Sequence, residues 1–156
     1  MKKLSNEVIE FFRSQGFVIV TTIDSAGYPH NSCKGIVELQ PQGLLYLLDL
    51  YQGETSRNLK RNRHMSITAV DEHRFKGYCL KGVARLMVGK KLKQELVGAW
   101  EDRIISRLTQ RVLKNVSGQK GHPRHPEALL PDPKYLIAVK VQEVIDLTPH
   151  LLRQEA

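Results

Sequence analysis

Six short segments with the composition of β-strands dominate this chain and restrict the architectures open to it. Each is rich in β-branched, aromatic or leucine residues, and turn-forming residues separate most of them. They cover residues 17–23, 28–39, 44–50, 65–70, 75–88 and 135–145. Because nearly all are joined by short turns, the sequence predicts a small antiparallel barrel, closed or partly closed, rather than a parallel sheet.

Three helices are expected around this sheet. Residues 6–13 place apolar side chains at helical spacing ahead of Gly16, and residues 55–62 form a short helix that Thr55 or Glu54 would cap. The third pattern predicts one long amphipathic helix over about residues 90–116, and its apolar stripe recurs at every fourth position. The stripe comprises Leu92, Leu96, Trp100, Ile104, Leu108, Val112 and Val116. Gly118 would end this helix, and residues 121–133 form a proline-rich loop.

The length of 156 residues fits one domain, which we place at residues 1–156. No apolar run approaches the roughly 20 residues that cross a bilayer, so we expect a cytoplasmic protein without a membrane partner. Cys33 and Cys79 lie in apolar segments without a CxxC pattern, so we expect packing residues rather than a disulfide. We expect no metal site, because His122 and His125 lie among prolines without further ligands at suitable spacing.

The formal net charge of +8 makes nucleic acid a partner to consider. Residues 90–124 hold nine Lys or Arg and three acidic residues, and a smaller basic cluster occupies positions 57, 60, 61 and 63. Between residues 90 and 124, however, only Trp100 could stack on a base. Its place in the apolar stripe indicates a core or dimer contact instead. This composition argues against nucleic acid as the partner.

Four motifs, in this order and spacing, resemble the pyridoxamine 5'-phosphate oxidase-like FMN-binding split-barrel family. They are residues 24–30 (DSAGYPH), 45–48 (LYLL), 55–62 (TSRNLKRN) and 78–84 (YCLKGVA). The resemblance covers about residues 11–86 and returns at 135–147. It implies a mainly β (α+β) fold, a six-stranded antiparallel Greek-key split β-barrel with flanking helices. It further implies FMN bound between the two chains of a homodimer, and oxidoreductase chemistry on a small-molecule redox substrate or electron-transfer partner.

The resemblance also implies a set of binding residues, carried over by position. The second strand runs along the flavin in that family, which implies contacts from His30, Asn31, Ser32, Cys33 and Lys34. The helix after the third strand receives the phosphate, which implies Thr55, Ser56 and Arg57, and Asp49 and Tyr51 would contact the ribityl chain or the ring. The physical chemistry agrees, because a helix start offers unpaired N–H groups and a positive dipole end to a phosphate. Lys34 could in addition favour the reduced, anionic flavin.

One departure from the family pattern bears on the ligand. The family commonly has Lys or Arg at or just before the position of Thr55, whereas this chain has Glu54. Either Glu54 points outward as a helix N-terminal charge, or the site binds a different ligand. Lys60, Arg61 or the basic residues 122–125 could supply the missing charge. On capping preference alone, Thr55 and Ser56 could also be nothing more than a helix N-cap.

These motifs do not identify the substrate. The vitamin B6 oxidases of the family end in a segment that bears both arginine and tryptophan. The last nine residues of this chain, TPHLLRQEA, contain an arginine but no tryptophan. We therefore do not expect pyridoxamine phosphate oxidation. The alternative function is a binding module without flavin, either a basic nucleic-acid binder or a haem-binding split barrel with His64, His73 or His150 as axial ligand.

Overall fold

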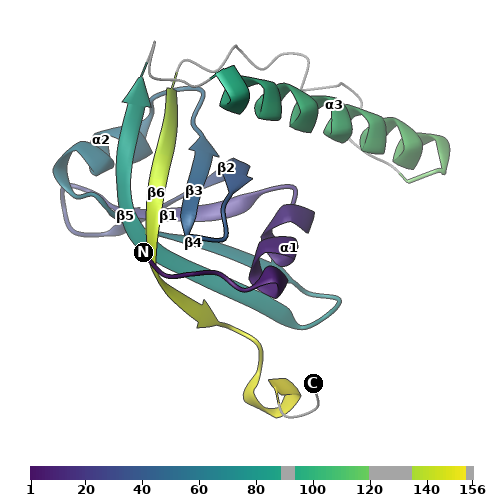
Figure 1. Cartoon of the computed structure of the whole chain (residues 1–156), viewed down its shortest axis with the longest axis horizontal. Helices are drawn as coiled ribbons and strands as arrows, with labels where there is room; N and C mark the ends of the chain where they lie inside the picture. The colour runs from purple at the N-terminus through teal and green to yellow at the C-terminus, as the bar shows by residue number, and fades with distance from the viewer. Residues whose placement is uncertain (89–93, 120–134, 154–156) are drawn as a thin grey trace.

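A closed antiparallel barrel forms the body of the protein (Figure 1). The structure is a computed structural model that describes residues 1–88, 94–119 and 135–153. Its strands are β1 (Val18–Ile23), β2 (Pro29–Leu39), β3 (Leu44–Leu48), β4 (His64–Asp71), β5 (Lys76–Val88) and β6 (Tyr135–Asp146). They pair in the order β1-β2-β3-β6-β5-β4, and β4 pairs back onto β1. The predicted six-stranded barrel is confirmed.

Turn chemistry accounts for the local hairpins of the barrel. Between β1 and β2 the Asp24 carboxylate accepts hydrogen bonds from the N–H groups of Ala26 and Tyr28, at 2.8 and 2.9 Å. Gly27 takes a φ of 87°, a conformation that costs other residues free energy. The closure itself is non-local, because β6 inserts between β3 and β5 while β4 joins β1. This connectivity makes a Greek-key barrel instead of a simple meander.

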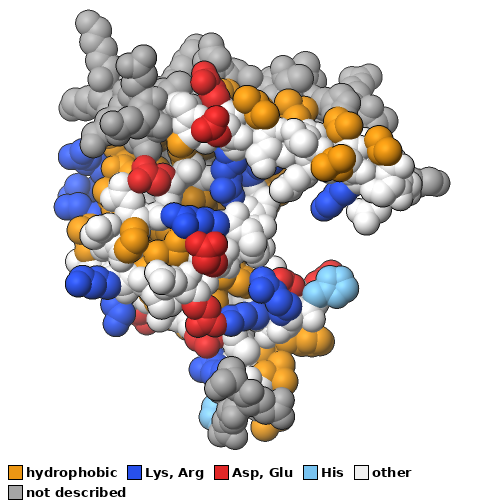
Figure 2. Space-filling view, turned by 45° about the vertical axis from the view of Figure 1, so that its right-hand side comes forward, with side chains coloured by type: hydrophobic (Ala, Val, Ile, Leu, Met, Phe, Trp, Pro, Cys, Tyr) orange, Lys and Arg blue, Asp and Glu red, His pale blue; other side chains and the backbone are white. Residues whose placement is uncertain are grey.

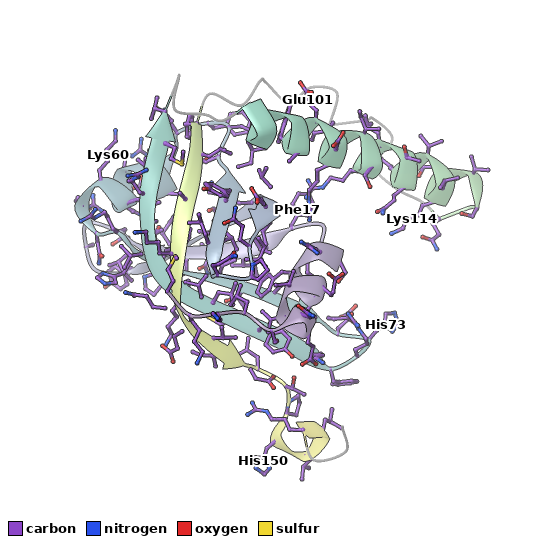
Figure 3. All side chains as sticks on the ribbon, viewed as in Figure 1. Phe17, Lys60, His73, Glu101, Lys114 and His150 are labelled. Atoms are coloured by element: carbon purple, nitrogen blue, oxygen red, sulfur yellow. The ribbon has the colours of Figure 1, made fainter. Side chains whose placement is uncertain are left out.

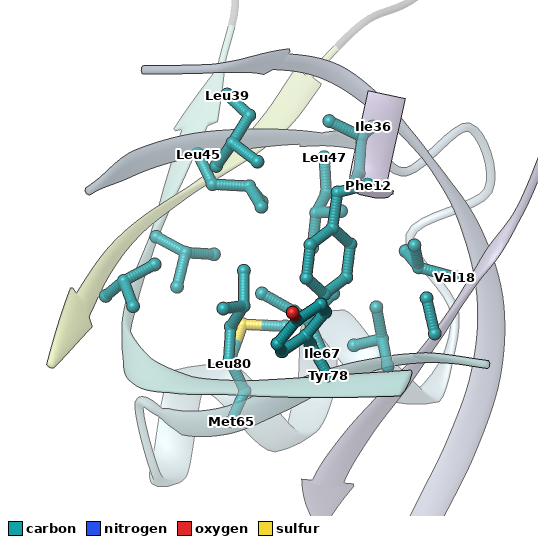
Figure 4. Close-up of a cluster of buried hydrophobic side chains, with 14 of the residues drawn as sticks. Phe12, Val18, Ile36, Leu39, Leu45, Leu47, Met65, Ile67, Tyr78 and Leu80 are labelled. Atoms are coloured by element: carbon teal, nitrogen blue, oxygen red, sulfur yellow. The ribbon is translucent and has the colours of Figure 1, made fainter. Parts of the chain in front are cut away.

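The hydrophobic core fills the inside of the barrel (Figure 4). Side chains that alternate along each strand point inward, so Val18 and Val20 of β1 are buried while Ile19 between them is exposed. The first helix, α1 (Asn6–Ser14), adds Phe12, which is fully buried in this core. Phe11 meets Tyr78 edge to face, with ring centroids 5.1 Å apart. Burial on this scale is what holds the strands in one register.

The helix α2 (Glu54–Arg61) lies against β1, β2 and β5 and begins one residue earlier than predicted. Its N-cap is Gly53, and no side chain caps the helix within the described chain. The prediction that Thr55 or Glu54 caps it is therefore wrong. The physical reason is that both side chains have other partners, since Thr55 contacts Ser32 and Glu54 pairs with Arg57.

The long helix α3 (Gln94–Val116) confirms the predicted amphipathic helix from residue 94 onward, while residues 90–93 and the predicted loop 121–133 lie outside the described residues. It packs on β2 and then extends away from the barrel (Figure 1). Four residues turn a helix by about 400°, so a stripe with a period of four drifts by about 40° per step. Trp100, Ile104 and Leu108 are accordingly half-buried, whereas Val112 and Val116 are exposed.

The end of the third strand and the C-terminal residues also differ from the predictions. The third strand ends at Leu48 instead of residue 50, and the chain closes with a short 3-10 helix at His150–Arg153. In the described part of the chain, no helix has the length and apolar character needed to cross a membrane.

Candidate functional site

The start of α2 meets β2 through two hydroxyl groups. Ser32 pairs with Val20 across the sheet, so its side chain lies on the inner side of β2, where α2 covers the barrel. Its hydroxyl lies 2.9 Å from the hydroxyl of Thr55. Thr55 and Ser56 are both only 3% exposed. One turn further along, buried Asn58 donates to the Thr22 hydroxyl at 3.1 Å. The family resemblance implied that Ser32 and Thr55 belong to one ligand site, but not that the two hydroxyls contact each other.

The N-cap of α2 is Gly53, so the first turn of the helix has no side-chain cap. This tests the interpretation that Thr55 and Ser56 serve only as a helix N-cap. Helix starts have N–H groups without intrahelical partners, and a capping side chain normally accepts from one of them. Neither hydroxyl serves as an N-cap here, since both residues lie inside the helix. The capping interpretation is therefore wrong, and among the described residues no side chain caps these N–H groups.

Glu54 and Arg57 form an ion pair on the exposed side of this helix. The Nε and Nη2 atoms of Arg57 donate to one Glu54 carboxylate oxygen at 2.9 and 2.5 Å. The pair is exposed to solvent, with side-chain exposures of 36% for Glu54 and 64% for Arg57. Arg57, implied to hold a phosphate, thus already has an anionic partner. Lys60 and Arg61 are exposed on the same helix (Lys60 in Figure 3), and the Arg61 guanidinium reaches back to donate to buried Asn58 at 2.7 Å.

The five consecutive β2 residues implied to line a flavin divide between two faces of the strand. His30, Ser32 and Lys34 pair with Thr22, Val20 and Val18, so they share the inner face with those buried residues. Asn31 and Cys33 pair with Thr21 and Ile19 and lie on the outer face. The Thr21 hydroxyl donates to Asn31 at 2.7 Å. Because successive side chains of a strand point to opposite faces, the five side chains cannot all contact one flavin ring. The ring can be contacted by the side chains of one face and by the backbone of the strand.

A buried ion pair joins the middle of β2 to the residue that follows β3. Lys34 Nζ donates to Asp49 Oδ1 at 2.8 Å, and the two side chains are 9% and 4% exposed. Asp49 alternates with the core residue Leu47, and Tyr135 alternates with Ile137 on the neighbouring strand β6. The three polar side chains therefore lie on the inner face, with Lys34 in the middle of β2, Asp49 just past the end of β3 and Tyr135 at the start of β6. Within the described chain, Asp49 Oδ2 and the Tyr135 hydroxyl have no hydrogen-bond partner.

The Tyr135 hydroxyl makes stability at alkaline pH testable. Burial, and then the negative charge of Asp49, raise the pKa of Tyr135 from 10 to about 12. The unfolded chain therefore ionises this group first, so its contribution to stability is complete below pH 10 and is lost toward pH 12.

We expect Tyr135→Phe to flatten the fall in the free energy of unfolding over that pH range, as urea titrations at several pH values would measure. At neutral pH the same variant should be nearly as stable as the parent, because the hydroxyl has no partner to lose in the described chain. Parallel pH profiles for the two proteins would contradict this assignment.

A pocket of about 190 Å³ lies between α3, the middle of β2 and the end of β3. Figure 2 shows the surface hollowed below α3, and Figure 3 places Phe17 beneath this helix. Trp100, Arg103, Ile104 and Arg107 line the pocket from α3, and the Arg107 guanidinium lies over the Phe17 ring at 4.7 Å from its centroid. Arg103 donates to the Gln15 carbonyl oxygen at 2.8 Å, and burial lowers its pKa.

Sequence reasoning missed the α3 side of this pocket and Tyr135. A signal for the arginines was present, because Arg103 and Arg107 are four residues apart and flank the apolar stripe. Tyr51, expected to contact the ribityl chain or the ring, is 74% exposed, and it lines this pocket together with Cys33, Lys34 and Asp49. Cys33, expected as a packing residue, is exposed, because β2 turns it to the outer face, while Cys79 is only half-buried.

None of the pocket's lining residues is a histidine. His64 and His73 are exposed at the two ends of β4, and His150 is exposed in the C-terminal 3-10 helix. Figure 3 shows His73 and His150 at the end of the molecule away from α3. In the described ranges no group of three or more His, Cys, Asp or Glu residues could hold a metal ion.

The closed Greek-key barrel, with α2 beside β2 and a long helix after β5, defines this chain as a split-barrel protein. It belongs to the pyridoxamine 5'-phosphate oxidase family, whose model matches residues 4–146. No curated protein matches the chain by sequence.

Solved structures of the same fold include three proteins of differing description. HupZ of Group A Streptococcus has a TM-score of 0.67 at 18% identity, covering 93% of this chain and 94% of that one. A Clostridium acetobutylicum protein related to general stress protein 26, of the pyridoxinephosphate oxidase family, has a TM-score of 0.63 at 18% identity, and the match covers 90% of this chain and 84% of that one. HutZ of Vibrio cholerae, a heme storage protein, has a TM-score of 0.52 at 18% identity, and the match covers 92% of this chain and 94% of that one. At such identities the likeness shows the fold alone.

Proposed function

We propose that this protein binds FMN, with the phosphate at the start of α2 and the flavin along β2, and that it acts as an oxidoreductase. One observation carries the proposal: the first turn of α2 has no side-chain cap, yet it holds two hydroxyls beside β2. N–H groups, hydroxyls and a basic side chain are the donors that bind a phosphate monoester. The family membership supports the same ligand.

The residues of the helix start have separate roles in this proposal. Backbone N–H groups of the first turn and the Ser56 hydroxyl would donate to the phosphate, while the Thr55 hydroxyl is held by Ser32. Arg57 would exchange its Glu54 partner for the phosphate. Lys34 is already neutralised by Asp49, so its effect on the flavin potential would be smaller than that of a lone cation. Bound FMN would supply the electron or hydride transfer.

The proposal is tested by the ligand that the protein binds. We expect purified protein to release FMN on denaturation, or flavin-free protein to quench FMN fluorescence on titration. FMN should bind at least about tenfold more tightly than riboflavin, since a charge-assisted hydrogen bond contributes about 1.5–3 kcal/mol. Equal affinities for the two flavins, or no change in fluorescence with either, would overturn the proposed phosphate site.

We further propose that two copies complete the site. Ile19 is 46% exposed in the middle of β1, and it pairs with exposed Cys33 on β2, so this outer face offers apolar surface. Light scattering on the flavin-bound protein should give twice the chain mass. A monomer that retains FMN would contradict the shared site.

Haem is the second candidate, because HutZ, described as a heme storage protein, has the same fold. Axial ligation by histidine would have to come from residues that lie outside the pocket below α3, such as His73 or His150. A Soret band after hemin addition, lost in His73→Ala or His150→Ala, would favour haem over flavin.

A further inference from the structure

Four basic side chains without an acidic partner gather on the side of the barrel where α2 meets β5. All four are exposed, and within the described residues none of them forms an ion pair. We call this group the basic surface, and it comprises Lys60, Arg63, Arg85 and Lys140. Figure 2 shows Lys and Arg side chains at the left edge of that view, the side on which Figure 1 draws α2 and β5. Such a cluster raises the local positive potential and attracts anions.

Strand register fixes the positions of two of these side chains. Arg85 of β5 and Lys140 of β6 alternate with buried neighbours such as Ala84 and Val139, so both side chains point outward. Arg85 pairs with Ala138, two residues before Lys140. Arg85 and Lys140 are therefore diagonal neighbours on the outer face of the sheet, about 7–8 Å apart.

The basic surface continues onto the end of α2. The Ala84 N–H donates to the Arg63 carbonyl oxygen at 2.8 Å, which holds Arg63 beside β5. Lys60 lies in the last turn of α2, and this helix lies against β5. Glu143 of β6 pairs with Lys81 at 3.4 Å, so its charge is already balanced. The four cations therefore have no compensating carboxylate within the described chain.

Basic residues on the other side of the barrel do have acidic partners. Around α1, the turn between β4 and β5 and the C-terminal 3-10 helix, each of four basic side chains pairs with a carboxylate. The pairs are Arg13–Glu10, Arg74–Asp71, Lys76–Glu7 and Arg153–Asp146. Because each pair is neutral, this side adds little to the field of the protein. The contrast makes the side formed by α2, β5 and β6 the more positive of the two.

We propose that the basic surface docks a small acidic protein that carries electrons to the flavin. An acidic partner is complementary in charge, and weak electron-transfer complexes bury less than about 1,200 Å², so a surface of this size suffices. An eight-residue helix is about 12 Å long, so Lys60 lies within that distance of the proposed phosphate site at the start of α2. The basic surface also stays exposed when two copies meet through Ile19 and Cys33, which lie on β1 and β2.

The composition of the basic surface favours a protein over a nucleic acid. It contains no aromatic side chain on which a base could stack. Its four cations can neutralise only about four phosphates, fewer than the roughly six to ten that a strong DNA binder contacts.

The electron transfer rests on the proposed function, whereas the docking does not. Two reduced carriers would dock in turn, and each would lose one electron. Water would supply the two protons that complete reduction of the flavin.

The probe is oxidised plant-type ferredoxin, a small acidic electron carrier, and cytochrome c serves as a basic carrier of similar size for comparison. We expect calorimetry at about 10 mM salt to give micromolar affinity for ferredoxin and no binding of cytochrome c. At about 100 mM salt the affinity for ferredoxin should fall at least about tenfold, because the Debye length shortens from about 30 to 10 Å. No ferredoxin binding at about 10 mM salt, or equal binding of the two carriers, would overturn the proposal.

Two double variants with the same change in net charge test where the partner docks. Arg85→Glu, Lys140→Glu reverses two charges of the basic surface, and it should weaken ferredoxin binding at least about tenfold. Arg13→Glu, Arg74→Glu reverses two charges on the other side of the barrel, and it should leave the affinity within about threefold. All four side chains are exposed, so both variants should fold. Equal weakening by the two variants would show an effect of net charge alone and overturn the docking surface.

A DNA duplex and added FMN separate the remaining outcomes. If a short duplex binds more tightly than ferredoxin at the same salt, and Arg85→Glu, Lys140→Glu removes that binding, the surface belongs to nucleic acid and the proposal is wrong. Ferredoxin docking on a protein that does not bind FMN would refute the proposed function and keep the docking surface. FMN binding without ferredoxin docking would do the reverse.

Discussion

Replacement of Lys34 by methionine is expected to lower the free energy of unfolding by about 3–5 kcal/mol. Lys34 and Asp49 form an ion pair at 2.8 Å with side-chain exposures of only 9% and 4%. Methionine is apolar and of similar length, so the main loss is the cation that compensates a buried carboxylate. Asp49 Oδ2 has no other partner within the described chain, which leaves little to replace Lys34. Urea unfolding followed by circular dichroism measures the effect.

The double variant Lys34→Met, Asp49→Leu distinguishes a charge effect from a packing effect. Replacement of a buried pair by apolar residues is often neutral or stabilising, so the double variant should recover most of the lost stability. Arg13→Met is the control, because the Arg13–Glu10 pair is 56% and 70% exposed and should contribute at most about 1 kcal/mol. A double variant no more stable than Lys34→Met would show that the loss comes from packing.

Arg57→Ala and Glu54→Gln are expected to change FMN affinity in opposite directions. If Arg57 binds the phosphate, its loss removes a charge-assisted interaction of about 1.5–3 kcal/mol, or about 10- to 150-fold in the dissociation constant. Glu54→Gln removes the carboxylate that holds Arg57 at 2.5–2.9 Å and repels the ligand. Since exposed pairs contribute up to about 1 kcal/mol, we expect FMN to bind about two- to fivefold more tightly.

A second exposed ion pair provides matched controls for this experiment. Asp71 and Arg74 are likewise three residues apart, with Asp71 at the end of β4 and Arg74 in the turn that leads to β5. Arg74→Ala and Asp71→Asn change the net charge in the same way as Arg57→Ala and Glu54→Gln, so any effect of overall charge appears in both sets. FMN titrations that show equal changes at the two pairs, or weaker binding in Glu54→Gln, would contradict a phosphate at Arg57.

The prediction that the chain binds a phosphate at α2 depends on physical features that the sequence shows only in part. Thr55, Ser56 and Arg57 are visible in the sequence, but their partners are not, because Ser32 is distant in the chain. Folding brings Ser32 to 2.9 Å from Thr55 and places Glu54 on Arg57. The capping prediction failed for the same reason, since capping preferences describe local chemistry and the tertiary contact of Thr55 overrides them.

The pocket below α3 is even harder to predict from the sequence than the contacts of α2. Its residues come from four parts of the chain: Phe17, the β2 segment, the end of β3 and α3. The apolar stripe of α3 predicted a helix that buries one face against another element. Which surface it packs against depends on how the barrel closes. The charge of Asp49 acts on Tyr135 of β6 only because β6 pairs with β3, a pairing of segments far apart in sequence.

The sequence by itself determined the strands, the helices and the antiparallel class of this protein, because residue composition, turn chemistry and periodicity act over a few neighbouring residues. Only the tertiary structure decided which side chains meet: the Lys34–Asp49 pair, the contact of Ser32 with Thr55, and the unsatisfied atoms around the pocket. These contacts depend on strand order and on which face each residue takes. Strand order follows from long-range burial, which no local pattern encodes.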